Sequence, residues 1–309
     1  MVLTKVCVLK ENNRNMAYTQ TLCAIIKKTM QMSEPNMKTY PNIAQSFGIA
    51  GILILGMIIF LPVNMLKKLI GYDAMFLIYY LLAVGLSFYI VGLIKKKKTG
   101  NNSFNFTIEN KRIIPFVIVG IIFLYCGIIS PINALISLTE STKVTYLDYG
   151  KLPGIFTLLQ SLIAAPILEE LIFRGIILDG LLKKYSPTKS ILISSLIFGL
   201  IHLDRFQFVT ALLMGIFIGW VYYRSRSLTL SIIIHALANL AVILMHYFIN
   251  IDSIKDNILL GMYGGITNLK IAIVGSVLIL VMCIYFLEKE FNKKTPEMAA
   301  QPANPDLFR

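Results

Sequence analysis

Residues 113–138 read IIPFVIVGIIFLYCGIISPINALISL, a long apolar run that contains no charged side chain. A helix needs about 20 mainly apolar residues to cross the hydrocarbon core of a bilayer. Comparable runs recur along the 309-residue chain, in which 56% of residues are hydrophobic and only 15% are charged. A soluble domain carries about a quarter charged residues. The sequence therefore predicts an all-α fold, a polytopic transmembrane helical bundle.

The apolar runs predict about eight membrane spans. The run at 152–182 is long for a single simple crossing, and the run at 190–203 is short for one. The remaining expected spans are residues 46–66, 74–94, 113–138, 206–222, 228–249 and 269–287.

The net charge of +13 comes from basic residues that stand in short runs beside apolar segments, as in Lys95–Lys98. Cytoplasmic loops have this pattern under the positive-inside rule. If both termini are cytoplasmic, the loops on that side carry eleven basic residues and the opposite loops carry six. No segment interleaves basic and aromatic residues on a soluble face, as nucleic-acid binding would require. We therefore expect cytoplasmic N- and C-termini, a lipid bilayer as the environment and no nucleic-acid partner.

Within the run at 152–182, the stretch APILEELIFR at 165–174 contains three charged residues. A charge near the bilayer centre costs about 2.5–3.5 kcal/mol, so such residues persist when they are paired or face water. Arg174 follows Glu170 by four residues, which places an acidic and a basic side chain on one helical face. Glu169 lies about 100° around the helix and lacks that partner. We interpret Glu170 and Arg174 as a structural pair and Glu169 as the functional carboxylate. The alternative is a salt-bridge network without chemistry.

Phe198 and His202 lie near the end of the run at 190–203 and are also four residues apart. The phenyl ring can therefore pack beside the imidazole and fix its rotamer. A lone histidine in a membrane helix can be a packing residue, but ionisable groups at this depth are usually functional. His202 is thus a candidate site residue.

His235 and Asn239 project from one face of the span at 228–249. The alternative to a functional role is that both residues only form hydrogen bonds between helices. At 1.5 Å per residue, His235 lies about 10 Å and Asn239 about 16 Å inside the cytoplasmic boundary, and Glu169 and His202 each lie about 20 Å inside it. Three separate helices thus bring polar groups to one slab of the membrane, which favours a shared site.

Three motifs are therefore present in order: EExxxR at 169–174, FxxxH at 198–202 and HxxxN at 235–239. Together they resemble the three motifs of the CAAX-protease and bacteriocin-processing family, also called the Abi family. The resemblance covers roughly residues 150–250 and departs from the family pattern at no motif position. It implies a helical intramembrane endopeptidase. Eukaryotic relatives remove the last three residues of prenylated proteins, and many bacterial relatives are linked to peptide maturation or bacteriocin self-immunity.

The resemblance also implies a role for each motif position. Glu169 and His202 would activate a water molecule, and His235 and Asn239 would form the oxyanion hole. Peptide hydrolysis needs such a base and such fixed donors. No serine or cysteine occupies a motif position, so a covalent intermediate is not favoured. The supporting positions would be Glu170, Arg174 and Phe198.

A zinc-dependent mechanism is the main alternative. Glu169, His202 and His235 together are a possible catalytic zinc set. However, the H-E-x-x-H motif is absent, each ligand would come from a different helix, and the four cysteines include no C-x-x-C pair. We favour a glutamate-dependent mechanism without metal or other cofactor.

The substrate class follows from residue usage. The Lys-, Ile- and Asn-rich composition is typical of a bacterial protein, which argues against prenylated substrates. We predict a peptide or membrane-anchored protein substrate and a location in the cell membrane. Two non-enzyme functions remain open, a catalytically silent scaffold and a proton-coupled transporter. Intact motifs argue against the scaffold, and the lack of a visible internal repeat argues against the transporter.

These inferences divide the chain into five parts. The predicted parts are a polar N-terminal segment at 1–45, the first three spans at 46–148, the catalytic membrane core at 149–250, the last span at 251–288 and a disordered tail at 289–309.

Overall fold

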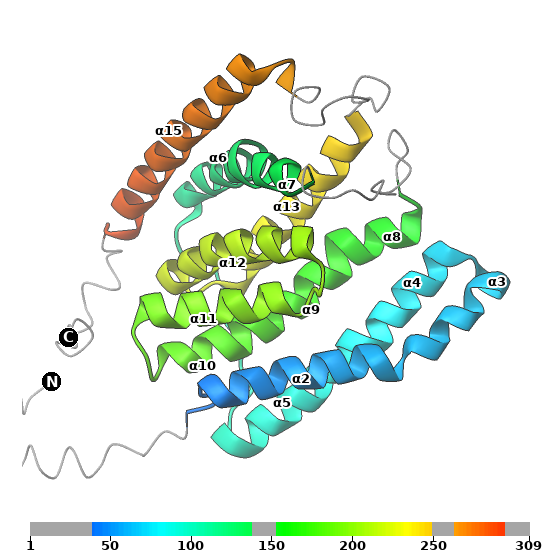
Figure 1. The fold of residues 1–309 in the computed structure, drawn as a ribbon. Coiled ribbons are helices and arrows are strands. Elements are labelled where there is room, and N and C mark those ends of the chain that lie inside the picture. The colour runs from blue at the N-terminus through cyan, green and yellow to red at the C-terminus, as the bar shows by residue number, and fades with distance from the viewer. Residues whose placement is uncertain (1–38, 138–152, 249–262, 294–309) are drawn as a thin grey trace, which may run out of the picture. The chain divides into compact units, whose positions relative to one another are not determined.

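A computed structural model of the chain describes residues 39–137, 153–248 and 263–293 (Figure 1). Every regular element in these three ranges is a helix, and they contain no strand. The predicted all-α fold is therefore confirmed for the described part of the chain. Most of the predicted N-terminal segment and most of the predicted tail lie outside the described residues.

Six of the described helices are long and apolar enough to cross a membrane, so the protein is a multi-pass membrane protein. The predicted count of about eight spans is approximate. Helix α11 (Pro187–Leu200) has only 14 residues and is about 21 Å long, which is less than the roughly 30 Å of a hydrocarbon core. The six long helices are Ile43–Ile70, Tyr72–Thr99, Lys111–Asn133, Arg205–Ser225, Leu228–Met245 and Ile266–Phe291.

The first two long helices form the N-terminal part of the described structure. The chain enters α2 through a capping box, in which the Asn42 side chain accepts from the Gln45 backbone N–H and the Gln45 side chain accepts from that of Asn42, each at 2.9 Å. The second long helix contains a π-helical segment, η3. The elements are α2 (Ile43–Ile59), η2 (Leu61–Leu66), α3 (Lys67–Ile70), α4 (Tyr72–Tyr80), η3 (Leu81–Gly85) and α5 (Leu86–Thr99).

The predicted end of the second span at residue 94 is wrong by five residues, because α5 continues to Thr99. Helix α5 stops where Gly100 adopts a left-handed conformation, with φ at 73°. Lys95, predicted to lie in a loop, is buried in the structure. Its Nζ donates to the Gly175 carbonyl oxygen at 3.3 Å and lies 4.3 Å from the centre of the Phe104 ring. The lysine can stay in the helix because it has these two partners.

The third and last long helices pack against each other. The last helix ends at Phe291, three residues beyond the predicted end at 288. Its final turn is held by an ion pair between Arg224 and Glu288, at 2.8 Å, and by the edge of the Trp220 ring against Phe291. The elements are η4 (Lys111–Ile113), α6 (Ile114–Leu124), η5 (Tyr125–Ile129), α7 (Ser130–Ser137) and α15 (Ile266–Phe291).

The predicted long run at 152–182 is one helical path that contains two π-helical segments. The first of them ends just before Pro166, which has no N–H to donate to the preceding turn. The second begins at Phe173 and includes Arg174. Such π-helical turns are common at functional sites. The elements are α8 (Ile155–Leu159), η6 (Gln160–Ala164), α9 (Ala165–Ile172), η7 (Phe173–Leu178) and α10 (Asp179–Leu182).

Helix α11 packs closely on α12 (Arg205–Ser225) because small residues line the contact. A methyl group added to Gly215 would lie 3.0 Å from the Cβ atom of Ser195. Helix α13 (Leu228–Phe248) follows and packs against α9 and η6. One apolar cluster joins α2, η3, α5, α9, η7 and α11, and a second joins α6, α12, α13 and α15. The polar residues of the three motifs lie where α9 and η7 meet α11, α12 and α13.

Candidate active site

Glu170 and Arg174 form the ion pair that their spacing predicts, with Oε1 and Nη1 2.7 Å apart. The pair is fully enclosed, since the exposed fractions of the two side chains are 0% and 1%. The second guanidinium nitrogen of Arg174 donates to the carbonyl oxygen of Gly215 on α12 at 3.2 Å. The guanidinium carbon also lies 4.9 Å from the centre of the Phe198 ring on α11. One arginine thus ties the helix of the first motif to two neighbouring helices.

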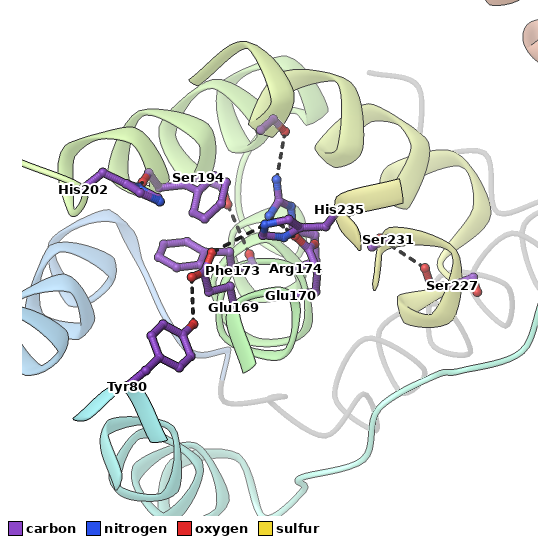
Figure 2. A network of polar contacts seen from close by, with 12 residues as sticks. Tyr80, Glu169, Glu170, Phe173, Arg174, Ser194, His202, Ser227, Ser231 and His235 are labelled. Atoms are coloured by element: carbon purple, nitrogen blue, oxygen red, sulfur yellow. Dashed lines mark hydrogen bonds and ion pairs between the residues drawn. The ribbon is translucent and has the colours of Figure 1, made fainter. Parts of the chain in front are cut away.

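His235 of the third motif lies between the two glutamates (Figure 2). Its Nδ1 is 2.8 Å from Oε1 of Glu170, and its Nε2 is 3.8 Å from Oε2 of Glu169. An ionised carboxylate can only accept, and Glu170 is paired with Arg174, so Nδ1 carries the hydrogen of this bond. Nε2 is then the nitrogen that faces Glu169, at a distance too long for a direct hydrogen bond.

Glu169 differs from Glu170 in its surroundings. Its side chain is 12% exposed and has no arginine or lysine partner among the described ion pairs. It is not free of contacts, however, because the Tyr80 hydroxyl donates to Oε1 at 2.8 Å. Tyr80 is not among the predicted site residues, because it follows another tyrosine in an apolar span and has no polar residue at helical spacing. Nothing in the sequence pattern points to it.

The predicted packing of Phe198 on His202 is also present. The ring centres are 5.2 Å apart and the planes are nearly perpendicular, at 84°. Nδ1 of His202 lies 2.8 Å from the Phe198 carbonyl oxygen, which can only accept, so Nε2 is the nitrogen left unbonded. The same phenyl ring contacts the His235 imidazole, at 5.8 Å between centres. The described contacts include no direct hydrogen bond between His202 and Glu169, and Phe198 is the residue that both imidazoles share.

Asn239 contacts the same helical path as His235, but further toward its N-terminus. Its Nδ2 donates to the carbonyl oxygen of Ser161, at 2.7 Å, within the π-helical segment η6. One N–H of the amide is used in this bond and the other is not. The structure therefore brings together Glu169, Glu170, Arg174 and His235. His202 is linked to them through the Phe198 ring, and Asn239 contacts the same helical path further toward its N-terminus.

The residues proposed as an alternative zinc set do not fit a three-ligand site as they are arranged. Across the described ranges, no three His, Cys, Asp or Glu side chains are grouped as a metal ion would require. Glu169 and His235 face each other, but the contacts described for His202 are with Phe198. A catalytic zinc usually has three protein ligands.

Residues 151–241 match the family model described as type II CAAX prenyl endopeptidase Rce1-like. The predicted family resemblance is confirmed. We refer to residues 151–241 as the Rce1-like segment, and all three motifs lie within it. A curated relative from Bacillus subtilis (strain 168), named "Putative membrane peptidase YdiL", is 36% identical over 88 residues. The match covers 28% of this chain and 36% of the relative's length. No solved structure matches the chain.

Helix α4 lies outside the Rce1-like segment and contacts it at two points. Near the start of α4, the Asp73 carboxylate accepts from the backbone N–H groups of Phe156 and Thr157, at 3.0 and 2.7 Å, and so caps the start of α8. At its end, Tyr80 reaches Glu169. Helix α4 is therefore fixed to both the start and the charged part of the helical path that carries the first motif.

Proposed function

We propose that this chain is an intramembrane endopeptidase that hydrolyses a peptide bond in a membrane-associated peptide or protein. The observation that carries the proposal is the approach of Glu169 Oε2 to His235 Nε2, at 3.8 Å, beside the buried Glu170–Arg174 pair. A carboxylate that has no arginine or lysine partner among the described ion pairs, and that lies next to an imidazole, suits general-base chemistry. The match of the Rce1-like segment to an endopeptidase family supports the same reaction.

In the proposed reaction, Glu169 and His202 activate a water molecule. Glu169 accepts a proton from the water molecule while the water oxygen attacks the carbonyl carbon of the scissile bond. His202 has Nε2 available to accept a hydrogen bond from the same water, because Nδ1 is bonded to the Phe198 carbonyl oxygen. When the tetrahedral intermediate collapses, the C–N bond breaks and the proton on Glu169 passes to the leaving amine. Atoms and charges balance without a covalent enzyme intermediate.

The proposed oxyanion hole consists of His235 and Asn239. Because Nδ1 of His235 carries the hydrogen of the bond to Glu170, Nε2 can donate only when the imidazole is doubly protonated. In that form, Nε2–H of His235 and the second N–H of Asn239 would donate to the oxygen that becomes negative in the transition state. Both side chains are held in advance, His235 by Glu170 and Asn239 by the Ser161 carbonyl oxygen. Fixed donors of this kind stabilise the transition state because they need no reorientation during the reaction.

Ser194 is a nearby hydroxyl that could be considered as a nucleophile. It is buried, and its hydroxyl donates to the Phe173 carbonyl oxygen at 3.2 Å. The described contacts give it no hydrogen bond to either histidine, so no base is placed to activate it. This environment favours water as the nucleophile.

We further propose that the protein acts in a bacterial cell membrane with both termini cytoplasmic. The asymmetry of basic residues between the two sets of loops supports this orientation. The B. subtilis relative supports the bacterial assignment. The substrates we favour are a peptide undergoing maturation or a bacteriocin against which the cell protects itself.

The proposal is tested with purified full-length protein in lipid nanodiscs and a library of membrane-inserting peptides, with products identified by mass spectrometry. Wild-type protein should cleave a subset of the peptides at defined bonds, and Glu169→Gln should cleave none. Equal cleavage by the two proteins would show that a contaminant or another residue is responsible. No cleavage of any peptide by the wild type, under conditions in which it is folded, would argue against the endopeptidase.

A further inference from the structure

Tyr80 and Glu169 lie far apart in the sequence but are joined in the structure by a hydrogen bond of 2.8 Å. We propose that Tyr80 is a positioning residue of the active site, which binds Oε1 of Glu169 and leaves Oε2 as the oxygen that accepts the proton from water. The inference rests on the proposed function. It adds a residue that lies outside the Rce1-like segment and belongs to none of its three motifs.

The surroundings of Tyr80 make this bond strong. The side chain is only 9% exposed and belongs to the apolar cluster that also contains Val84, Ala165 and Phe173. A hydrogen bond to an ionised carboxylate is stronger than one between neutral groups, and it gains further strength where water is excluded. Tyr80 is also the last residue of α4 before the π-helical segment η3, so the backbone changes its winding directly after it.

The bond makes the two oxygens of Glu169 unequal. Oε1 accepts from Tyr80, whereas Oε2 faces Nε2 of His235 and has no hydrogen-bond donor among the described contacts. The other charged or titratable groups around the carboxylate are Glu170 and Arg174 on its own helix, which bond to each other. His202 is linked to this group through the Phe198 ring, which contacts both imidazoles. Tyr80 is therefore the direct donor to Glu169 in the described structure.

Removal of this donor has a predictable effect on chemistry. Without the hydroxyl, the ionised form of Glu169 loses its hydrogen bond and the carboxylate is free to rotate. Fewer molecules then hold an ionised, correctly oriented base at a given pH. The acid limb of the kcat/KM profile should move to higher pH, and kcat near neutral pH should fall about tenfold.

Loss of the hydroxyl should not detach α4 from the Rce1-like segment. Asp73 holds the start of α4 against Phe156 and Thr157 independently of Tyr80. The chain also offers a matched control in the preceding residue. The hydroxyl of Tyr79 donates to the Met57 carbonyl oxygen at 3.0 Å, within the N-terminal helices, and the described contacts do not join it to Glu169. Tyr79→Phe and Tyr80→Phe thus remove the same group from neighbouring positions.

The first measurement compares pH profiles of peptide cleavage by the wild type, Tyr79→Phe and Tyr80→Phe. Tyr80→Phe should show the displaced acid limb and the tenfold lower kcat, with KM within about twofold of the wild type. Tyr79→Phe should retain the wild-type profile. A purely structural role for Tyr80 would lower the thermal midpoint or the active fraction but would not move the acid limb. An unmoved limb in folded Tyr80→Phe would overturn the proposal.

The second measurement does not depend on catalysis. Infrared difference spectra across a pH titration contain the C=O band of protonated Glu169, which is identified by its absence in Glu169→Gln. The midpoint of this band should rise in Tyr80→Phe and stay in place in Tyr79→Phe. If neither the wild type nor any variant cleaves peptides but the midpoint rises as expected, the proposed endopeptidase function is wrong. The hydrogen bond by which Tyr80 positions Glu169 is supported in that case. If cleavage depends on Glu169 but the midpoint is the same in the wild type, Tyr79→Phe and Tyr80→Phe, only the proposed role of Tyr80 is wrong.

Discussion

His235 is hydrogen-bonded to Glu170, with Nδ1 of the imidazole 2.8 Å from the same carboxylate oxygen that Arg174 contacts at 2.7 Å. Glu170 therefore does more than neutralise the arginine, because it also decides which imidazole nitrogen faces Glu169. The two adjacent glutamates have separable tasks. One is enclosed and holds two other residues in place, and the other is placed to react.

The first prediction follows from this separation. Glu169→Gln should lower kcat/KM by about 10³-fold or more while the thermal midpoint changes little, because the amide keeps the size of the side chain. Glu170→Ala should lower activity and also the free energy of unfolding by about 3–5 kcal/mol, because it leaves a buried guanidinium without its partner. Melting in nanodiscs and peptide cleavage measure the two effects. Normal cleavage by Glu169→Gln would show that another group is the base.

The second prediction concerns the geometry of Arg174. Its two terminal nitrogens contact Glu170 and the Gly215 carbonyl oxygen on different helices, and a lysine can offer only one compact charge. Arg174→Lys should therefore lower the free energy of unfolding by about 1–3 kcal/mol. Arg224→Lys is the matched control, since its ion pair with Glu288 is partly exposed and should contribute less than about 1 kcal/mol. Equal losses of unfolding free energy in the two variants would contradict the proposal that the two contacts of Arg174 join the helices.

The third prediction tests the oxyanion hole. If Asn239 donates to the transition state, Asn239→Ala should lower kcat by about 10²–10³ with little change in KM. Asn133 offers a control, because its Nδ2 also bonds to another helix, at Thr210 Oγ1 and 2.9 Å, without contact to the motif residues. Asn133→Ala should change stability more than kcat. A similar loss of kcat in both variants would indicate that Asn239 acts through packing.

The fourth prediction concerns metal. The arrangement of Glu169, His202 and His235 does not fit a three-ligand site, so prolonged chelation should leave the cleavage rate unchanged. Elemental analysis of the purified protein should find no stoichiometric zinc. If chelation stops the reaction and added zinc restores it, with about one ion per chain, the zinc-dependent mechanism is correct. The peptidase function would stand in that case.

The fifth prediction fixes the orientation in the membrane. Thr107 lies in the loop after α5, and Lys68 lies between α2 and α4, and both are exposed. In a variant without native cysteines, Thr107→Cys should react with an impermeant reagent only from the cytoplasmic side, and Lys68→Cys only from the outside. The opposite labelling would invert the proposed topology.

Contacts between residues four apart, in a helix or in the turn that ends it, were predictable from the sequence, because the helical repeat fixes which side chains are neighbours. The Glu170–Arg174 ion pair and the Phe198–His202 ring contact both follow from a spacing of four residues, and both are present. The all-α architecture follows in the same way from the length of the apolar runs. In each case the residues that determine the feature are close together in the chain.

Contacts between helices were not predictable from spacing. The bonds from His235 to Glu170 and from Tyr80 to Glu169 depend on how the helices pack, and no local pattern encodes that packing. Lys95 was assigned to a loop because lysine runs usually mark one, yet a carbonyl oxygen and an aromatic ring on other segments hold it inside. The π-helical segments were also not predicted, because no residue spacing in the sequence marks where a helix widens by one residue.

Two π-helical segments, at Gln160–Ala164 and Phe173–Leu178, stand on either side of α9. A π-helical turn accommodates one residue more than an α-helical turn, so loss of one residue from either segment would let the chain close as ordinary α-helix. Because the widened turn and the α-helical turn each complete one revolution, the residues on either side of the deletion would keep their directions, and only the carbonyl groups within the segment would change partners. At the first segment, such a deletion would alter the surroundings of the Ser161 carbonyl oxygen, to which Asn239 donates, and would leave the two carboxylates in place. Loss of a single codon there would therefore remove the support of Asn239 without redirecting Glu169 and Glu170.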